Sequence, residues 1–245
     1  MSKIAFPKLI AHRGASTYAP ENTLASLRKA AELGVSWVEC DVALSACGQT
    51  VIMHDSSLNR TTNGKGEVAK TSYELISQLD AGGWFAPEFK DERVPTLDQW
   101  LSCTAALDLG LNLELKGIPS QADQLMEKVL ASLKLHWSED YANLCVSSFS
   151  LENLEAARRA DAKLPLGLLS KAWSEEYGEL LDSLSCTSIN LAHQSLDERV
   201  MRQIAAHNVA VLAYTVDDKK LAEHLFELGV CGVFTNDPCL LKEGG

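Results

Sequence analysis

Residues 37–55 bring together two acidic side chains and a histidine at a spacing that could support chemistry. The segment reads WVECDVALSACGQTVIMHD. Its first half is predicted to be a strand, in which period-two alternation places Glu39 and Asp41 on the same face. The chain then returns as a second strand, and a hairpin centred near Cys47 would bring Asp41 roughly opposite His54. Adjacent buried carboxylates require a cation or a proton, although an exposed edge hairpin with solvated acids explains this segment alone equally well.

Further charged residues end two other predicted strands. The first strand ends in His12 and Arg13, and the third ends in Glu114 and Lys116, again two residues apart and therefore on one face. In a closed parallel barrel the carboxyl ends of all strands share one rim. The three strands would then deliver three carboxylates, two histidines, one arginine and one lysine to the same place, a combination that chance does not readily supply.

The three carboxylates form a ligand set made only of oxygen. Glu39, Asp41 and Glu114 suit a hard cation such as Mg²⁺ or Ca²⁺. Zn²⁺ prefers nitrogen and sulfur ligands, and the chain contains neither a His-x-His nor an HExxH pattern. Three carboxylates, one divalent ion and two basic side chains would leave the site with a net charge of about +1, which attracts a singly charged phosphodiester.

The remaining polar side chains could bind such a phosphodiester and transfer the protons needed to cleave it. Arg13 would bind phosphate oxygens through two N–H groups, and Lys116 would act as a point charge. His12 and His54 are left for proton transfer, one as the general base and one as the general acid to the leaving alkoxide. The chemistry that these residue types predict is metal-assisted cleavage of a phosphodiester.

The order of predicted elements indicates how these residues are positioned. Apart from the return strand of the hairpin, eight strand candidates alternate with helices, which is typical of an α/β protein with a (β/α)₈ TIM barrel. An open doubly wound sheet is the structural alternative, but no GxGxxG follows the first strand and no GxxxxGK[ST] occurs. We expect one domain over residues 1–245, with a small insertion after the second strand at about 56–95.

Two capping boxes predict where helices begin in and after the insertion. One is Thr71-x-x-Glu74, which would start a short helix, and the other is Thr96-x-x-Gln99, which would start a longer one. The rest of the insertion is rich in turn residues and shows no long periodic element.

Composition narrows the classes of partner. The net charge of −11 argues against general binding of nucleic acids or anionic membranes. No secretory signal is visible, and no apolar run approaches the roughly 18 residues of a membrane-spanning helix. The seven cysteines are odd in number and lack CxxC spacing. We therefore expect a cytoplasmic protein without stable membrane insertion, whose anionic substrate is attracted by a local cluster of positive charge.

Short motifs occur in a characteristic order over nearly the whole chain. They are HRG at 12–14, PENT at 20–23, ExD at 39–41, HD at 54–55, NRTTNGKG at 59–66, PTL at 95–97, LELK at 113–116, SSF at 147–149 and GVFTND at 232–237. In these motifs the sequence resembles the glycerophosphodiester phosphodiesterase family. Because no signal peptide is visible, the chain looks like a member of the cytoplasmic bacterial branch. Two departures are small: SACGQT replaces the usual Asp-Gly turn after ExD, and TND replaces the common TD.

The resemblance implies a TIM barrel that hydrolyses glycerophosphodiesters to sn-glycerol 3-phosphate and an alcohol. It also implies one divalent cation, Mg²⁺ in the first place and Ca²⁺ as the alternative. The residues that match the family's functional positions are Glu39, Asp41 and Glu114 for the metal, His12 and His54 for proton transfer, and Arg13 and Lys116 for the phosphate. Because some descriptions of the family assign the His54 position to the metal, that residue keeps two alternative roles.

Five further residues have both a functional and an ordinary explanation. Glu21 and Asn22 closely follow HRG and are candidates for substrate contact, but acids and caps are also common in a first helical turn. Phe149 and Tyr214 could stack on the glycerol or choline end of the substrate, or pack as core aromatics. Trp84 in the insertion would belong either to a lid or to a small core.

Two other functions compete with this prediction. A lysophospholipase D-type phosphodiesterase would use the same barrel, but it needs an apolar approach surface, and the insertion has no long amphipathic stretch. A catalytically inactive barrel that acts as a binding protein is the second alternative, and the loss of an acid or a histidine, which would favour it, is not observed. A homo-oligomer is compatible with the sequence, as is attack by either the glycerol hydroxyl or water.

Overall fold

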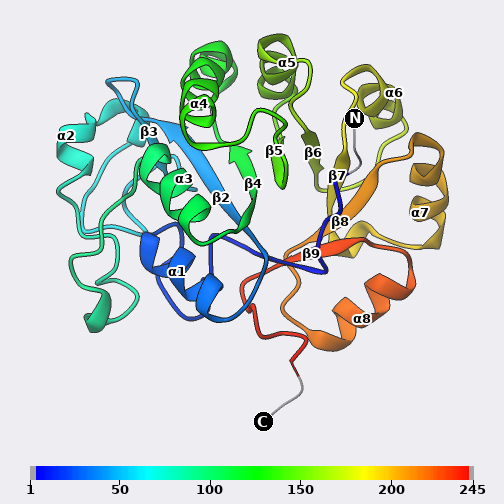
Figure 1. Cartoon of the computed structure of the whole chain (residues 1–245), viewed down its shortest axis with the longest axis horizontal. Coiled ribbons are helices and arrows are strands. Elements are labelled where there is room, and N and C mark those ends of the chain that lie inside the picture. The colour runs from blue at the N-terminus through cyan, green and yellow to red at the C-terminus, as the bar shows by residue number, and fades with distance from the viewer. Residues whose placement is uncertain (1–3, 243–245) are drawn as a thin grey trace.

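Eight parallel strands close into a barrel in the computed structural model, which describes residues 4–242 (Figure 1). The barrel closes because β1 pairs with β2 on one side and with β9 on the other. The barrel strands are β1 (Leu9–Ala11), β2 (Trp37–Leu44), β4 (Gly110–Leu115), β5 (Leu144–Ser148), β6 (Leu166–Ser170), β7 (Ser188–Ala192), β8 (Ala210–Tyr214) and β9 (Gly232–Thr235). The predicted TIM-barrel fold is confirmed.

Helices surround the barrel and cover its outer face (Figure 1). They are α1 (Leu24–Glu32), α2 (Tyr73–Ile76), α3 (Leu97–Ala106), α4 (Ala122–His136), α5 (Leu151–Ala160), α6 (Glu176–Ser183), α7 (Glu198–Ile204) and α8 (Lys219–Glu227). The main hydrophobic core lies between these helices and the outward-facing strand residues such as Val38, Cys40 and Val42. Alternation along β2 therefore leaves Glu39 and Asp41 to face the barrel interior. None of the described helices is long and apolar enough to cross a membrane.

The two predicted capping boxes have different outcomes. At α3, the side chain of Thr96 accepts from the N–H of Gln99 and the Gln99 side chain accepts from the N–H of Thr96, so that box is confirmed. The box at Thr71 is wrong, because α2 begins one residue later than expected, with Ser72 as its N-cap and no side-chain cap bond. The Thr71 hydroxyl instead donates to the carbonyl of Glu67.

Strand β3 (Thr50–Ile52) pairs antiparallel with β2 and forms the predicted hairpin. The register differs by one residue from expectation: the N–H of Met53 donates to the carbonyl of Asp41 at 2.9 Å, so Met53 rather than His54 lies opposite Asp41. A hairpin that is symmetric about Cys47 requires this pairing. His54 lies beyond the last ladder pair, and its ring reaches the end of the barrel from there.

The segment after β3 packs around a small cluster of its own, beside the edge of the barrel (Figure 1). Its buried members are Val51, Met53, Leu58, Val68, Ile76, Ala81 and Val94. Trp84 belongs neither to this cluster nor to the lining of the central cavity described below: its side chain is 42% exposed and stacks edge-on against Phe85 at 5.7 Å.

Candidate active site

Three carboxylates from β2 and β4 meet inside the barrel. Glu39 and Asp41 lie two residues apart on β2, and Glu114 pairs with Asp41 across the β2–β4 ladder. One carboxylate oxygen from each residue lies within 4.8 Å of the others. The parallel register therefore builds the cluster that the sequence predicted.

The electrostatics of this cluster fit a divalent cation. Burial, with repulsion from Asp41 and Glu114, raises the pKa of Glu39 well above its ordinary value. Burial and the charge of Asp41 likewise raise the pKa of Glu114 to about 7. One oxygen of Glu39 (Oε1) and one of Asp41 (Oδ1) are buried without a hydrogen-bond partner. Unpaired carboxylate oxygens that converge in this way are the donor set of a hard cation such as Mg²⁺ or Ca²⁺.

Two basic side chains lie against the cluster. The N–H of Arg13 donates to Glu39 at 2.8 Å, and its guanidinium lies 3.3 Å from Asp41. Arg13 adopts a left-handed backbone (φ 58°), an uncommon conformation for a side-chain-bearing residue. The ammonium of Lys116 lies 2.7 Å from Glu114 and 3.6 Å from Asp41. Both cations thus offset the negative charge of the carboxylates; Arg13 also lines the cavity that opens beside them, whereas Lys116 does not.

Glu21 and Asn22 lie behind these residues and are not among those that line the cavity. Asn22 is buried, donates to Asp41 at 2.8 Å, and accepts from the N–H of Asp41 at 3.3 Å. The Glu21 carboxylate accepts from Arg13 at 2.7 Å and from Arg60 at 2.7 and 2.8 Å. Although burial alone would raise the pKa of Glu21, hydrogen bonds from Arg60 and the charge of Arg13 lower it to about 2. Both residues position other residues of the site, and both carboxylate oxygens of Glu21 already accept hydrogen bonds from arginines.

His12 is held by an amide from the other end of the chain. Its Nδ1 lies 2.8 Å from Oδ1 of Asn236, whose N–H and Nδ2 both donate to Asp217 at 2.7 Å. Because a carboxylate only accepts, Asn236 must turn its oxygen toward His12, and Nδ1 must carry the proton. The other ring nitrogen, Nε2, is then free to accept and lies 4.0 Å from Glu39. Burial, together with the charge of Arg13, lowers the pKa of His12 to about 4.

His54 is held by a different set of residues. Its Nδ1 lies 2.7 Å from Oδ1 of Asp55, and Arg60 binds the same carboxylate at 2.8 and 2.9 Å. Hydrogen bonds from Arg60 keep the pKa of Asp55 far below its ordinary value. Since Arg60 also binds Glu21, one guanidinium from the insertion connects the His54 side of the site to the Arg13 side.

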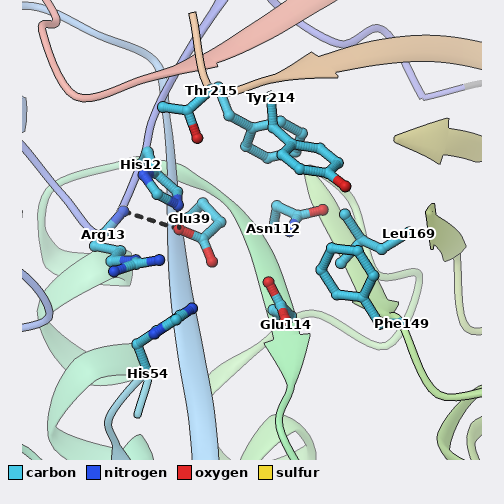
Figure 2. A pocket seen from close by; sticks show the side chains of 11 residues that line it. His12, Arg13, Glu39, His54, Asn112, Glu114, Phe149, Leu169, Tyr214 and Thr215 are labelled. Carbon is cyan, nitrogen blue, oxygen red and sulfur yellow. Dashed lines mark hydrogen bonds and ion pairs between the residues drawn. The ribbon is translucent and has the colours of Figure 1, made fainter. Parts of the chain in front are cut away.

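A cavity of about 210 Å³ opens between these groups. Figure 2 shows His12, Arg13, His54 and Glu39 on one side, Phe149, Leu169 and Tyr214 on the other, and Glu114 between them. Phe149 meets Tyr214 edge-on at 5.8 Å, and the Tyr214 hydroxyl donates to the carbonyl of Ser170 at 2.9 Å. The residues predicted from sequence that line this cavity are His12, Arg13, Glu39, His54, Glu114, Phe149 and Tyr214.

Several residues of the site were not predicted. Asn112, Leu169, Thr215 and Phe234 line the cavity, while Asp55, Arg60, Asp217 and Asn236 hold the residues that do. The signal for Asn112 was present, because it lies two residues before Glu114 and must share its face of the strand. Arg60 lies in the motif NRTTNGKG and Asn236 in the motif GVFTND. The residues that each of them contacts are brought together only by the tertiary fold.

Nearly the whole chain is similar to known proteins. The model of the family described as "Glycerophosphoryl diester phosphodiesterase family" matches residues 12–240. A putative glycerophosphodiester phosphodiesterase of Bacillus subtilis is 34% identical over 96% of this chain and 97% of its own length. A glycerophosphodiester phosphodiesterase of Caldanaerobacter subterraneus is 32% identical over 97% and 98%. A solved phosphodiesterase of Oleispira antarctica, in complex with the product sn-glycerol-3-phosphate, is 38% identical, covers 95% of this chain and 94% of its own, and superposes with a TM-score of 0.92.

Proposed function

The chain belongs to the glycerophosphoryl diester phosphodiesterase family, and from this premise we propose that it hydrolyses glycerophosphodiesters to sn-glycerol 3-phosphate and an alcohol. The observation that carries the proposal is the cavity in which a buried carboxylate cluster, two histidines and Arg13 face an aromatic wall. The similar Oleispira protein, which holds sn-glycerol 3-phosphate, supports the same substrate class.

Glu39, Asp41 and Glu114 would hold one divalent cation, which we propose to be Mg²⁺, with Ca²⁺ as the alternative. Five carboxylates and three cationic side chains form the interacting set, which leaves two negative charges that one divalent ion cancels. The balance is zero rather than the +1 expected from the sequence, because Glu21 and Asp55 add two negative charges and Arg60 one positive charge. The set consists of Glu21, Glu39, Asp41, Asp55, Glu114, Arg13, Arg60 and Lys116. A bound ion of this kind supplies Lewis-acid stabilisation of charge on phosphoryl oxygens.

The chain's own residues would orient the phosphate and move protons. Arg13 and Lys116 bind phosphate oxygens from the side of the cluster. His12, with its proton on Nδ1, offers a bare Nε2 and acts as the general base. His54, whose Nδ1 faces the carboxylate of Asp55, is then the general acid that delivers a proton to the leaving alkoxide. The aromatic wall of Phe149 and Tyr214 contacts the carbon atoms of the glycerol unit.

The size of the cavity favours a small, water-soluble diester over a lipid. A volume of about 210 Å³ is below the roughly 300–1,000 Å³ that drug-sized ligands occupy. It therefore supports a glycerophosphodiester more than the lysophospholipid of a lysophospholipase D-type enzyme.

All seven cysteines are free, which supports the proposed reducing, cytoplasmic setting.

Release of sn-glycerol 3-phosphate from glycerophosphocholine, with and without EDTA, tests the proposal. We expect Mg²⁺-dependent turnover that falls by two or more orders of magnitude in His12→Ala, since a general base contributes about 10²–10⁴-fold. His224→Ala, an exposed histidine on α8, is the matched control and should retain wild-type turnover. Absence of turnover on every water-soluble glycerophosphodiester, with metal present, would reject the proposal and favour the lysophospholipid or binding-protein alternative.

A further inference from the structure

Asn112 presents an unused hydrogen-bond acceptor to the cavity. Its side chain is 1% exposed and lies among the residues that line the cavity. The amide nitrogen Nδ2 donates to the Ser147 hydroxyl at 2.8 Å, which accounts for one end of the side chain. The oxygen Oδ1 is buried and has no partner. Figure 2 shows this oxygen turned away from Glu39, toward the side on which Tyr214 and Leu169 lie.

An acceptor in this state requires an explanation. Buried polar atoms in folded proteins are nearly always hydrogen-bonded, and an unsatisfied one is costly. Asn112 cannot turn away from the cavity, because alternation along β4 fixes its side chain to the barrel interior. An amide oxygen accepts a hydrogen bond from an O–H or N–H donor, such as a hydroxyl. It offers nothing to a phosphate oxygen or to a trimethylammonium group, since neither of them can donate a hydrogen bond.

The position of Asn112 relative to the carboxylate cluster sets the size of that donor. Asn112 precedes Glu114 by two residues on β4 and pairs with Glu39 across the β2–β4 ladder. Glu39, a member of the cluster, is therefore the direct neighbour of Asn112 across the ladder, whereas Glu114 lies about 6.6 Å further along the strand. A three-carbon alcohol that is esterified to a phosphate at the cluster can bridge this separation, with its carbon atoms against the wall formed by Phe149 and Tyr214.

We propose that Asn112 is a specificity-determining residue that accepts a hydrogen bond from a hydroxyl of the glycerol unit. The inference rests on the proposed function, because it assumes that the phosphate lies beside the carboxylate cluster. Binding of the glycerol hydroxyl satisfies Oδ1. A propyl ester of equal length, which has no free hydroxyl, leaves Oδ1 buried and unpaired. A site of this kind discriminates strongly against the analogue that lacks the donor.

Calorimetric titration of the Mg²⁺-loaded protein tests the role of Asn112 without turnover. The ligands are sn-glycerol 3-phosphate, n-propyl phosphate, which lacks both hydroxyls, and phosphoethanolamine, which represents the other end of a diester. The wild type should prefer sn-glycerol 3-phosphate over propyl phosphate by roughly 10- to 100-fold. Asn112→Leu should lose this preference and keep its affinity for propyl phosphate. Asn112→Ala is the second variant, and Ser147→Ala, which removes the neighbour but not the acceptor, should keep most of the preference.

Three results would overturn the inference. They are equal wild-type affinities for the two phosphates, an undiminished preference in both Asn112 variants, and a loss that affects only phosphoethanolamine, which would place the other alcohol on Asn112. Turnover of glycerophosphocholine by the wild type distinguishes failure of the Asn112 inference from failure of the proposed function. Normal turnover with equal affinities refutes the role of Asn112 alone, while absent turnover refutes the proposed function.

Discussion

The ring of His12 is oriented by two residues outside the cavity, and a change in one of them should reduce catalysis. In the wild type, Asp217 accepts from the amide of Asn236, and this forces the Asn236 oxygen onto Nδ1 of His12. In Asp217→Asn the new side chain can donate as well as accept, so the Asn236 amide is free to reverse. Its NH₂ group then faces Nδ1 and favours the tautomer in which Nε2 carries the proton and cannot act as a base.

The magnitude follows from the bonds that fix the amide. Asp217 accepts one hydrogen bond from the backbone N–H of Asn236 and one from its Nδ2, both of 2.7 Å, and the second of these fixes the side-chain amide. Hydrogen bonds to charged groups contribute about 1.5–3 kcal/mol, and because Asp217 is exposed the lower end applies. About 1.4 kcal/mol corresponds to a tenfold change, so we expect kcat to fall roughly tenfold. KM should stay near the wild-type value, since neither residue contacts the phosphate.

The double variant Asp217→Asn/Asn236→Asp provides the rescue. The introduced carboxylate at 236 only accepts, so it again requires a proton on Nδ1 of His12, while the amide at 217 donates to it. We expect kcat to return to within about threefold of wild type, as coupled residues restore one another in a double-mutant cycle. The assays are kcat and KM with glycerophosphocholine and Mg²⁺, and ¹⁵N NMR of the His12 ring nitrogens. An unchanged tautomer and kcat in Asp217→Asn, or no recovery in the double variant, would refute the reasoning.

Three further predictions concern other parts of the site. Arg60→Met should lower kcat/KM about tenfold by releasing Glu21 and Asp55. Its unfolding free energy in urea should change by less than about 1 kcal/mol, because the pairs are partly exposed; a fall in stability with intact kinetics would contradict this role. Mg²⁺ affinity should weaken as pH falls below about 7, where Glu114 binds a proton in the absence of the ion, and proton release in calorimetry with two buffers checks it. Gly14→Ala should lower the unfolding free energy by roughly 2 kcal/mol or more, since its φ of +78° and a Cβ contact of 2.7 Å with the α1 backbone exclude a side chain; an unchanged urea midpoint would disprove it.

Periodicity was sufficient to predict the barrel and the centre of the site. Strand alternation predicted that Glu39 and Asp41 share a face, and the rule that strand ends meet at one rim brought Glu114 beside them. Both inferences are local, because they need only the strand boundaries and a closed parallel sheet.

Local reasoning was less successful where one residue of register or a competing hydrogen bond decides the result. Thr71 satisfies the capping-box pattern, yet its hydroxyl bonds the carbonyl of Glu67 and the cap passes to Ser72. Nothing in the pattern distinguishes these partners, because a threonine hydroxyl can bond either group. Asn112 was missed for another reason. Its neutral amide does not by itself indicate a metal-binding or catalytic residue, as the carboxylate of Glu114 does, although the same alternation places both side chains in the barrel.

The residues that hold the two histidines could not be predicted, because they come from parts of the chain that only the closed barrel brings together. Asn236 follows β9 and meets His12 because β9 pairs with β1. Asp55 and Arg60 hold His54 from the segment that extends the hairpin. These two sets of contacts share no hydrogen-bonded residue, so barrel closure positions one histidine and the insertion positions the other. The proposed catalysis by the pair therefore requires both structures at once.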